Sequence, residues 1–119
     1  MSLKTQDLFD VSNKVVVVTG GSRGIGEMIT SGFLANKSKV YITARKEEAL
    51  VKKAEELSQK YSCECIPVSG DISNSEGIDA LVNFLNDAEP EGIDFLINNA
   101  GAAWGANYDD FPESGWDKV

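Results

Sequence analysis

VVVVTGGSRGIG, residues 15–26, places four valines directly before a cluster of glycines. The run from Lys14 to Thr19 predicts a short strand that is buried on both faces, as strands of a parallel sheet are. The apolar spacing after the glycines predicts a helix over residues 24–36. The expected buried stripe of this helix consists of Ile25, Met28, Ile29, Gly32 and Phe33. A glycine-rich turn that joins a buried strand to a helix is typical of phosphate binding, because the helix N-terminus presents free amides and the positive end of its dipole.

The rest of the chain alternates between strand and helix patterns. Strands are expected at residues 39–43, 63–68 and 93–98, and helices over residues 46–61, after Ser73, and from residue 111 to 119. Ser73 and Glu76 form the S-x-x-E pattern of a capping box. The inner face of the helix that follows is expected to carry Ile78, Leu81, Val82 and Leu85. The order βαβαβαβ predicts an α/β fold with a doubly wound parallel sheet that has helices on both faces.

Composition excludes several classes of function. The net charge of −8 argues against a nucleic-acid partner, which would need clustered Lys and Arg. With two cysteines and no histidine, the chain offers no metal site made of four Cys or His ligands. Cys63 and Cys65 are instead expected to be small buried residues on one face of a strand. No apolar run approaches the ~20 residues of a membrane helix, and the first residues lack the apolar region of a signal peptide, so a cytoplasmic protein is expected.

The spacing of the glycines distinguishes between two kinds of phosphate loop. Gly21 and Gly26 have the gap of a Walker A loop, but Glu27 and Met28 stand where that loop needs Lys and Ser or Thr. The alternative is a dinucleotide turn. There Gly20 would make the tight turn, Gly24 would allow close approach of a ligand, and Gly26 would let the helix pack against the strand.

Three motifs in this order resemble those of the short-chain dehydrogenases/reductases. Residues 19–26, TGGSRGIG, resemble the family's TGxxxGIG fingerprint, and residues 98–101, NNAG, resemble its motif after the fourth strand. Asp71 and Ile72 resemble its adenine-contacting pair, although Asp71 could instead cap the following turn. The resemblance implies that residues 14–119 are part of a Rossmann dinucleotide-binding domain, apparently truncated, with residues 1–13 as a lead-in. The implied cofactor-binding residues are Gly20, Gly21, Ser22, Arg23, Gly24, Ile25, Gly26, Arg45, Asp71, Ile72, Asn99, Ala100 and Gly101.

The end of the second expected strand indicates which dinucleotide binds. In Rossmann folds an acid near this position holds the 2′-hydroxyl of NAD, whereas an Arg accommodates the 2′-phosphate of NADP. Ala44 and Arg45 stand here, and the first carboxylate is Glu47. Arg23 in the glycine turn can approach the same phosphate, to which a guanidinium can make two parallel bonds. NADP is therefore the expected cofactor, with NAD as the alternative.

The resemblance implies reduction of a small-molecule carbonyl or oxidation of an alcohol. Residues 98–119 look most like the corresponding stretch of 3-oxoacyl reductases and their rhamnolipid-pathway relatives. The family's catalytic Tyr-x-x-x-Lys does not occur among the 119 residues, so no catalytic residue is assigned and the isolated chain is expected to be inactive. The alternatives are a non-catalytic dinucleotide-binding module and an inactive truncated product. A homo-oligomer is expected only for a full-length fold, and the isolated chain is expected to be poorly soluble, because its fourth strand would be an open edge.

Overall fold

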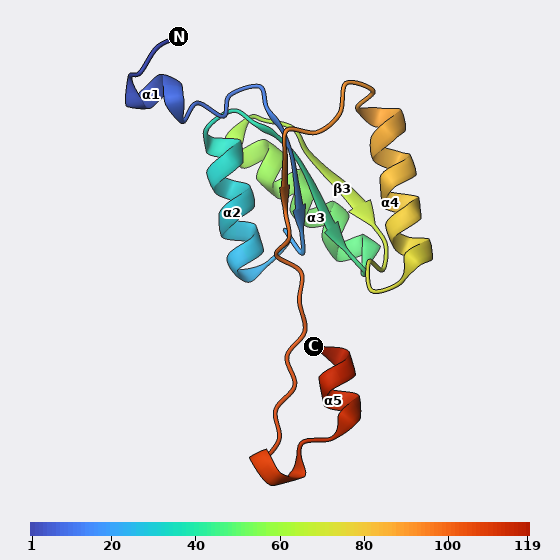
Figure 1. The fold of residues 1–119 in the computed structure, drawn as a ribbon. Helices are drawn as coiled ribbons and strands as arrows, with labels where there is room; N and C mark the ends of the chain where they lie inside the picture. Colours follow the sequence, from blue (N-terminus) through green and yellow to red (C-terminus); the bar gives the residue numbers. More distant parts are fainter.

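The computed structural model describes all residues from 1 to 119 as a parallel sheet flanked by helices, with an extended C-terminal segment (Figure 1). Strands and helices alternate from β1 onward, as the sequence predicts. The elements are α1 (Thr5–Leu8), β1 (Val15–Thr19), α2 (Gly24–Ala35), β2 (Lys39–Ala44), α3 (Glu47–Tyr61), β3 (Cys65–Ser69), α4 (Ser75–Ala88), β4 (Phe95–Ile97), the 3₁₀ helix η1 (Tyr108–Asp110) and α5 (Glu113–Lys118).

The four strands lie in the order β3-β2-β1-β4, and all neighbouring pairs are parallel. Alternate residues of each strand face opposite sides of the sheet. Val16 and Val18 face the cluster that α2 and α3 complete with Leu34 and Leu50. This order, with helices on both faces, confirms the expected doubly wound α/β fold.

α4 covers the opposite face of the sheet. Tyr41 of β2 is only 2% exposed and makes an edge-to-face contact with Phe84 of α4, with ring centroids 6.2 Å apart. The Tyr41 hydroxyl donates a hydrogen bond of 2.6 Å to the carboxylate of Glu89 at the end of α4, and Lys39 forms an ion pair with the same carboxylate. The C-terminal end of α4 is thus tied to β2 by polar contacts as well as by an aromatic one.

The expected stripe of α2 is wrong in part. Ile25 and Met28 are 71% and 73% exposed, whereas Gly26, Thr30 and Leu34 are buried. The helix turns this second stripe inward because Gly26 packs directly against the turn that follows β1. Ile29 and Phe33 do pack against the core, as expected.

The expectations for α4 also need correction. Leu81 and Leu85 are half-buried, as expected, but Ile78 and Val82 are each 47% exposed. Phe84, which the pattern did not include, contacts Tyr41 of the sheet while remaining 42% exposed. The cap is not Ser73 but Asn74, whose side chain accepts a 2.8 Å hydrogen bond from the Gly77 amide. The helix begins at Ser75, so the residue in the N-cap position is Asn74, and Ser73 lies one position before it, where its amide donates to Asp71.

Three other elements begin two residues later than expected. β3 begins at Cys65 because the Cys63 amide still bonds back to Ser58 at the end of α3, with Ser62 in the left-handed conformation (φ 49°). Cys63 is therefore half-buried before the strand, and Cys65 is buried within it; both are free thiols. β4 is shorter than expected. The last helix starts at residue 113, with Pro112 as its N-cap rather than in its first turn.

After β4 the chain leaves the sheet as an extended segment that carries η1 and α5 away from the other elements (Figure 1). This segment packs mainly on itself. Phe111 and Trp116 form an edge-to-face pair with centroids 5.4 Å apart, and Gly115 lies against the Trp104 ring. None of the helices in the chain combines the length and the apolar character that crossing a bilayer requires.

Candidate nucleotide-binding site

The predicted site residues all follow the carboxyl ends of the four strands. Residues 20–26 lie between β1 and α2, Arg45 directly follows β2, Asp71 and Ile72 follow β3, and residues 99–101 follow β4. In open α/β sheets, ligands bind in the crevice outside these strand ends, where the direction of the connections reverses. Here the connections diverge between β1 and β4, so the glycine turn and residues 98–101 border the same crevice.

The glycine turn has the backbone geometry that glycine permits. Gly20 and Gly24 adopt φ values of 65° and 58°, in the left-handed region that disfavours other residues. A Cβ atom on Gly26 would collide with the Gly20 carbonyl and lie 2.6 Å from the Asn99 side chain, whereas one on Gly24 would meet no atom within 4 Å. Gly26 therefore allows close packing of α2, while the open space at Gly24 is compatible with an approaching ligand.

The first turn of α2 presents unused hydrogen-bond donors. The backbone amides from Ser22 to Gly26 donate no hydrogen bond within the chain, and the Arg23 side chain provides no cap. Unpaired amides at the start of a helix, together with its dipole, favour an anion such as a pyrophosphate. The turn thus fits the phosphates of a dinucleotide.

Asn99 connects the glycine turn to β4. Its side-chain nitrogen donates to the carbonyl oxygens of Thr19 and Gly20, at 3.0 and 3.2 Å. The Thr19 hydroxyl in turn accepts hydrogen bonds from the amides of Asn99 and Ala100, at 3.1 and 3.0 Å. The backbone of the crevice is therefore held from both sides, whereas Gly101, the next residue, makes no such contact.

Thr30 is a site-supporting residue that the sequence analysis missed. It is fully buried on α2, and its hydroxyl lies 3.1 Å from the Gly21 carbonyl and 2.9 Å from the Gly26 carbonyl. The signal that could have found it is the spacing of Gly26, Thr30 and Leu34. These residues lie four apart and mark one line along the helix.

The two arginine side chains at the rim are exposed, and Asp71 is half-buried. Neither Arg23 nor Arg45 forms an ion pair within the chain. Asp71 accepts a 3.0 Å hydrogen bond from the Ser73 amide; hydrogen bonds from Ser73 and the nearby Arg45 charge lower the pKa of Asp71. The Asp71 carboxylate thus bonds to the turn before α4, the alternative considered for it, and remains charged beside Arg45.

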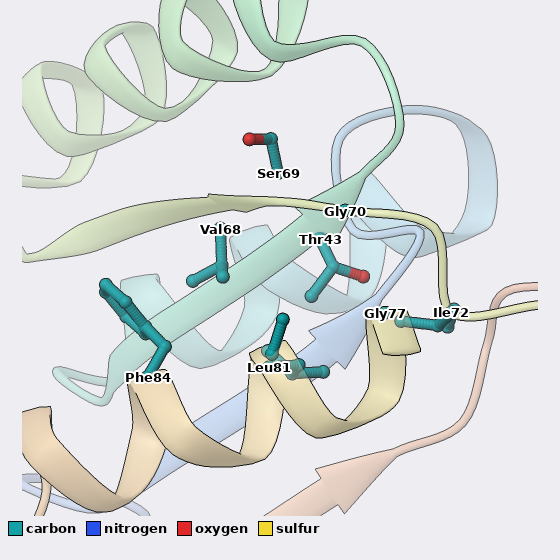
Figure 2. A pocket seen from close by; sticks show the side chains of 9 residues that line it. Thr43, Val68, Ser69, Gly70, Ile72, Gly77, Leu81 and Phe84 are labelled. Carbon is teal, nitrogen blue, oxygen red and sulfur yellow. The ribbon is translucent and has the colours of Figure 1, made fainter. Parts of the chain in front are cut away.

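A cavity of about 140 Å³ lies next to this crevice, between α4 and the ends of β2 and β3. Figure 2 shows Leu81 and Phe84 of α4 facing Thr43 and Val68 of the sheet across it. Ile72 and Gly77 close one end. The lining of the cavity is mostly apolar and includes Ile72, one of the predicted cofactor-binding residues.

Comparison with known proteins agrees with this architecture. The sequence profile described as "short chain dehydrogenase" matches residues 14–119. The rhamnolipids biosynthesis 3-oxoacyl-[acyl-carrier-protein] reductase of Pseudomonas aeruginosa is 41% identical over 111 residues, which cover 93% of this chain and 42% of that protein. The short-chain dehydrogenase/reductase PhomF of Diaporthe leptostromiformis is 40% identical over 100 residues, 84% of this chain and 33% of that protein. The chain belongs to the short-chain dehydrogenase family.

Solved structures share the fold. The Pseudomonas aeruginosa RhlG/NADP active-site complex has a TM-score of 0.86 at 40% identity, covering 93% of this chain and 42% of that one. L-sorbose reductase from Gluconobacter frateurii, solved with NADPH and L-sorbose, has a TM-score of 0.83 at 32% identity, covering 92% of this chain and 42% of that one. The chain therefore spans less than half the length of these relatives.

Proposed function

We propose that this chain is the NADP(H)-binding portion of an oxidoreductase that reduces a carbonyl to an alcohol. The observation that carries the proposal is the end of β2. Ala44 is its last residue, Arg45 follows with a free, exposed guanidinium, and no carboxylate occupies the position that would bind a ribose 2′-hydroxyl. Two relatives of similar fold were solved with NADP or NADPH, which supports the same choice of cofactor.

In this proposal each part of the crevice binds one part of the cofactor. The free amides of the glycine turn hold the pyrophosphate, and Arg45 and Arg23 hold the 2′-phosphate. Asp71 accepts a hydrogen bond from the adenine amino group, and Ile72 packs beside the ring. When bound, the dinucleotide supplies the hydride for the reduction.

The substrate is proposed from the relatives alone. A 3-oxoacyl compound is our first candidate, because the P. aeruginosa relative is named as a 3-oxoacyl reductase. The test is consumption of NADPH by the intact protein in the presence of a 3-oxoacyl thioester. Binding of NADPH without turnover of this or other small carbonyl compounds would favour the non-catalytic dinucleotide-binding module.

The cofactor is tested by titrating the intact protein with NADPH and NADH and following nucleotide fluorescence. We expect NADPH to bind about tenfold more tightly, since one charge-assisted contact to phosphate has about this effect. Arg45→Ala should remove most of that preference, and Ala44→Asp should reverse it by placing a carboxylate beside the ribose. Lys52→Ala, which removes an exposed charge from α3, is the matched control and should leave it unchanged. Equal or tighter binding of NADH by the unaltered protein would overturn the assignment.

A further inference from the structure

The buried hydroxyl of Thr30 lies within hydrogen-bond distance of a carbonyl oxygen in the glycine turn. A hydroxyl carries a single proton, yet two carbonyl oxygens lie within hydrogen-bond distance of it, those of Gly21 and Gly26. Within a helix, the Gly26 carbonyl is the regular acceptor for the Thr30 backbone amide, four residues later. The buried Gly21 carbonyl has no backbone donor, so the Thr30 hydroxyl is the group that satisfies it.

Fixing this carbonyl also fixes the amide on the other side of the same peptide bond. The peptide group is planar and trans, so the Gly21 carbonyl and the Ser22 N–H point in opposite directions. The Gly21 carbonyl points inward, to Thr30 in the core, and the Ser22 N–H therefore points outward. The Ser22 amide is one of those that donate no hydrogen bond within the chain.

Close packing leaves this peptide little freedom. A Cβ atom on Gly21 would lie 2.8 Å from the Thr30 hydroxyl oxygen and 2.6 Å from a methyl group of Ile42. The backbone at Gly21 is thus pressed against α2 and β2. Without the Thr30 hydroxyl, a buried carbonyl would lack a partner, and the turn could satisfy it only by rotating this peptide toward water.

We propose that Thr30 is a positioning residue for nucleotide binding, because its hydroxyl holds the Gly21 carbonyl inward and so directs the Ser22 amide toward the bound dinucleotide. This inference rests on the proposed function of the crevice. It adds a residue that touches no cofactor atom and lies on the buried side of α2.

The test compares two substitutions at this position in the intact protein. Thr30→Val keeps the shape and removes the donor, and we expect it to raise the Kd for NADPH about tenfold, the effect of one lost hydrogen bond. Thr30→Ser keeps the donor and should bind within about twofold of the unaltered protein. If Thr30→Ser binds as weakly as Thr30→Val, or if Thr30→Val binds normally, the inference is wrong.

Ser38→Ala is the matched control for general destabilisation. Ser38 is also fully buried, and its hydroxyl donates a 2.6 Å bond to the Val11 carbonyl, but it lies just before β2, at the opposite end of the sheet from the crevice. Both Ser38→Ala and Thr30→Val should lower the melting temperature, and only Thr30→Val should weaken NADPH binding. Equal effects of the two substitutions on the Kd would contradict a positioning role.

A measurement without nucleotide separates this inference from the cofactor assignment. The NMR order parameter of the Ser22 amide should fall in Thr30→Val and remain unchanged in Thr30→Ser and Ser38→Ala. An unaltered Ser22 amide in Thr30→Val would overturn the inference even if NADPH binds. Failure of the unaltered protein to bind either dinucleotide would instead overturn the proposed function, and the order parameter would still decide the role of Thr30 in the turn.

Discussion

The side-chain nitrogen of Asn99 lies 3.0 Å from the carbonyl oxygen of Thr19, and this hydrogen bond joins the ends of β1 and β4. Asn99 donates a second bond to Thr19, from its backbone amide to the Thr19 hydroxyl. β4 is only three residues long, so its own ladder to β1 is short. Asn99 secures the carboxyl end of β4, and the bonds between Asp94 and Val15 secure its beginning.

We predict that Asn99→Ala lowers the free energy of unfolding by about 1–3 kcal/mol, because two carbonyl oxygens lose their donor. Asn99→Asp should lower it further, since a carboxylate would face those oxygens. Urea unfolding measures both changes. Asn98→Ala is the control, because the neighbouring Asn98 is exposed and its side chain makes no hydrogen bond within the chain. Equal losses for Asn98→Ala and Asn99→Ala would contradict the role of Asn99.

Gly26 and Gly32 lie on the same helix and should respond in opposite ways to alanine. At Gly26 the new methyl group collides with the Gly20 carbonyl, and overpacking of this kind costs about 1–3 kcal/mol. At Gly32 it meets no atom within 4 Å, and alanine should stabilise α2 by about 0.5–1 kcal/mol. Thermal unfolding of the two variants gives the comparison. A neutral effect of Gly26→Ala would mean that α2 does not pack on the turn as described.

The pKa of Glu89 makes the free energy of unfolding depend on pH. The hydrogen bond with Lys39, followed by that from Tyr41, lowers the pKa of Glu89 from its usual 4.5, and Glu89 in turn raises the pKa of Lys39. A lowered carboxyl pKa stabilises the folded state above the unfolded value, and this contribution is lost as the pH falls through the folded-state pKa. Glu89→Gln should therefore be about 1 kcal/mol less stable at neutral pH, an effect expected of a partly exposed ion pair.

The difference between Glu89→Gln and the unaltered protein should shrink as the pH falls below the usual carboxyl pKa of 4.5, and it should disappear once the pH has passed the lowered pKa of Glu89 in the folded state. Denaturant unfolding at a series of pH values from 7 down to about 3 follows this change. The exposed neighbour Glu91 provides the control substitution, Glu91→Gln. A difference that persists unchanged in acid would show that Glu89 acts through its shape rather than its charge.

The sequence predicted the order of the elements better than the faces of the helices. The continuous valine run of β1 has one interpretation, a doubly buried strand, and the structure confirms it. In α2 the apolar residues cover more than one side, so periodicity alone favoured Ile25 and Met28. Which side faces inward is decided by Gly26, whose missing side chain lets the helix approach the turn. The glycine spacing predicted this close packing at Gly26, but hydropathy periodicity does not register it, so the wrong apolar residues were assigned to the inner face.

For the candidate site, too, the sequence predicted the positions of the loops but not the hydrogen bonds within them. The motifs predicted which loops carry it, and the parallel sheet brings those loops to one edge. The hydrogen bonds of Asp71 to Ser73 and of Thr30 to Gly21 depend on the orientation of individual peptide groups, which the motifs do not specify. Thr30 is a small polar residue among the apolar residues of α2, and such a residue gives no sign in the sequence that it supports a site. The importance of Thr30 follows from its hydrogen bond to the buried carbonyl of Gly21.

The bond between Asn99 and Thr19 spans 80 residues of sequence, and this separation has a consequence for the order of folding. β1, β2 and β3 can assemble with α2 and α3 through shorter connections, whereas β4 must close a long loop before it gains any contact. We therefore expect the crevice to be completed late in folding, when Asn99 reaches Thr19 and Gly20. A nucleotide that binds only the completed crevice would lower the population of molecules in which β4 has detached, so cofactor supply would protect this edge of the sheet from aggregation.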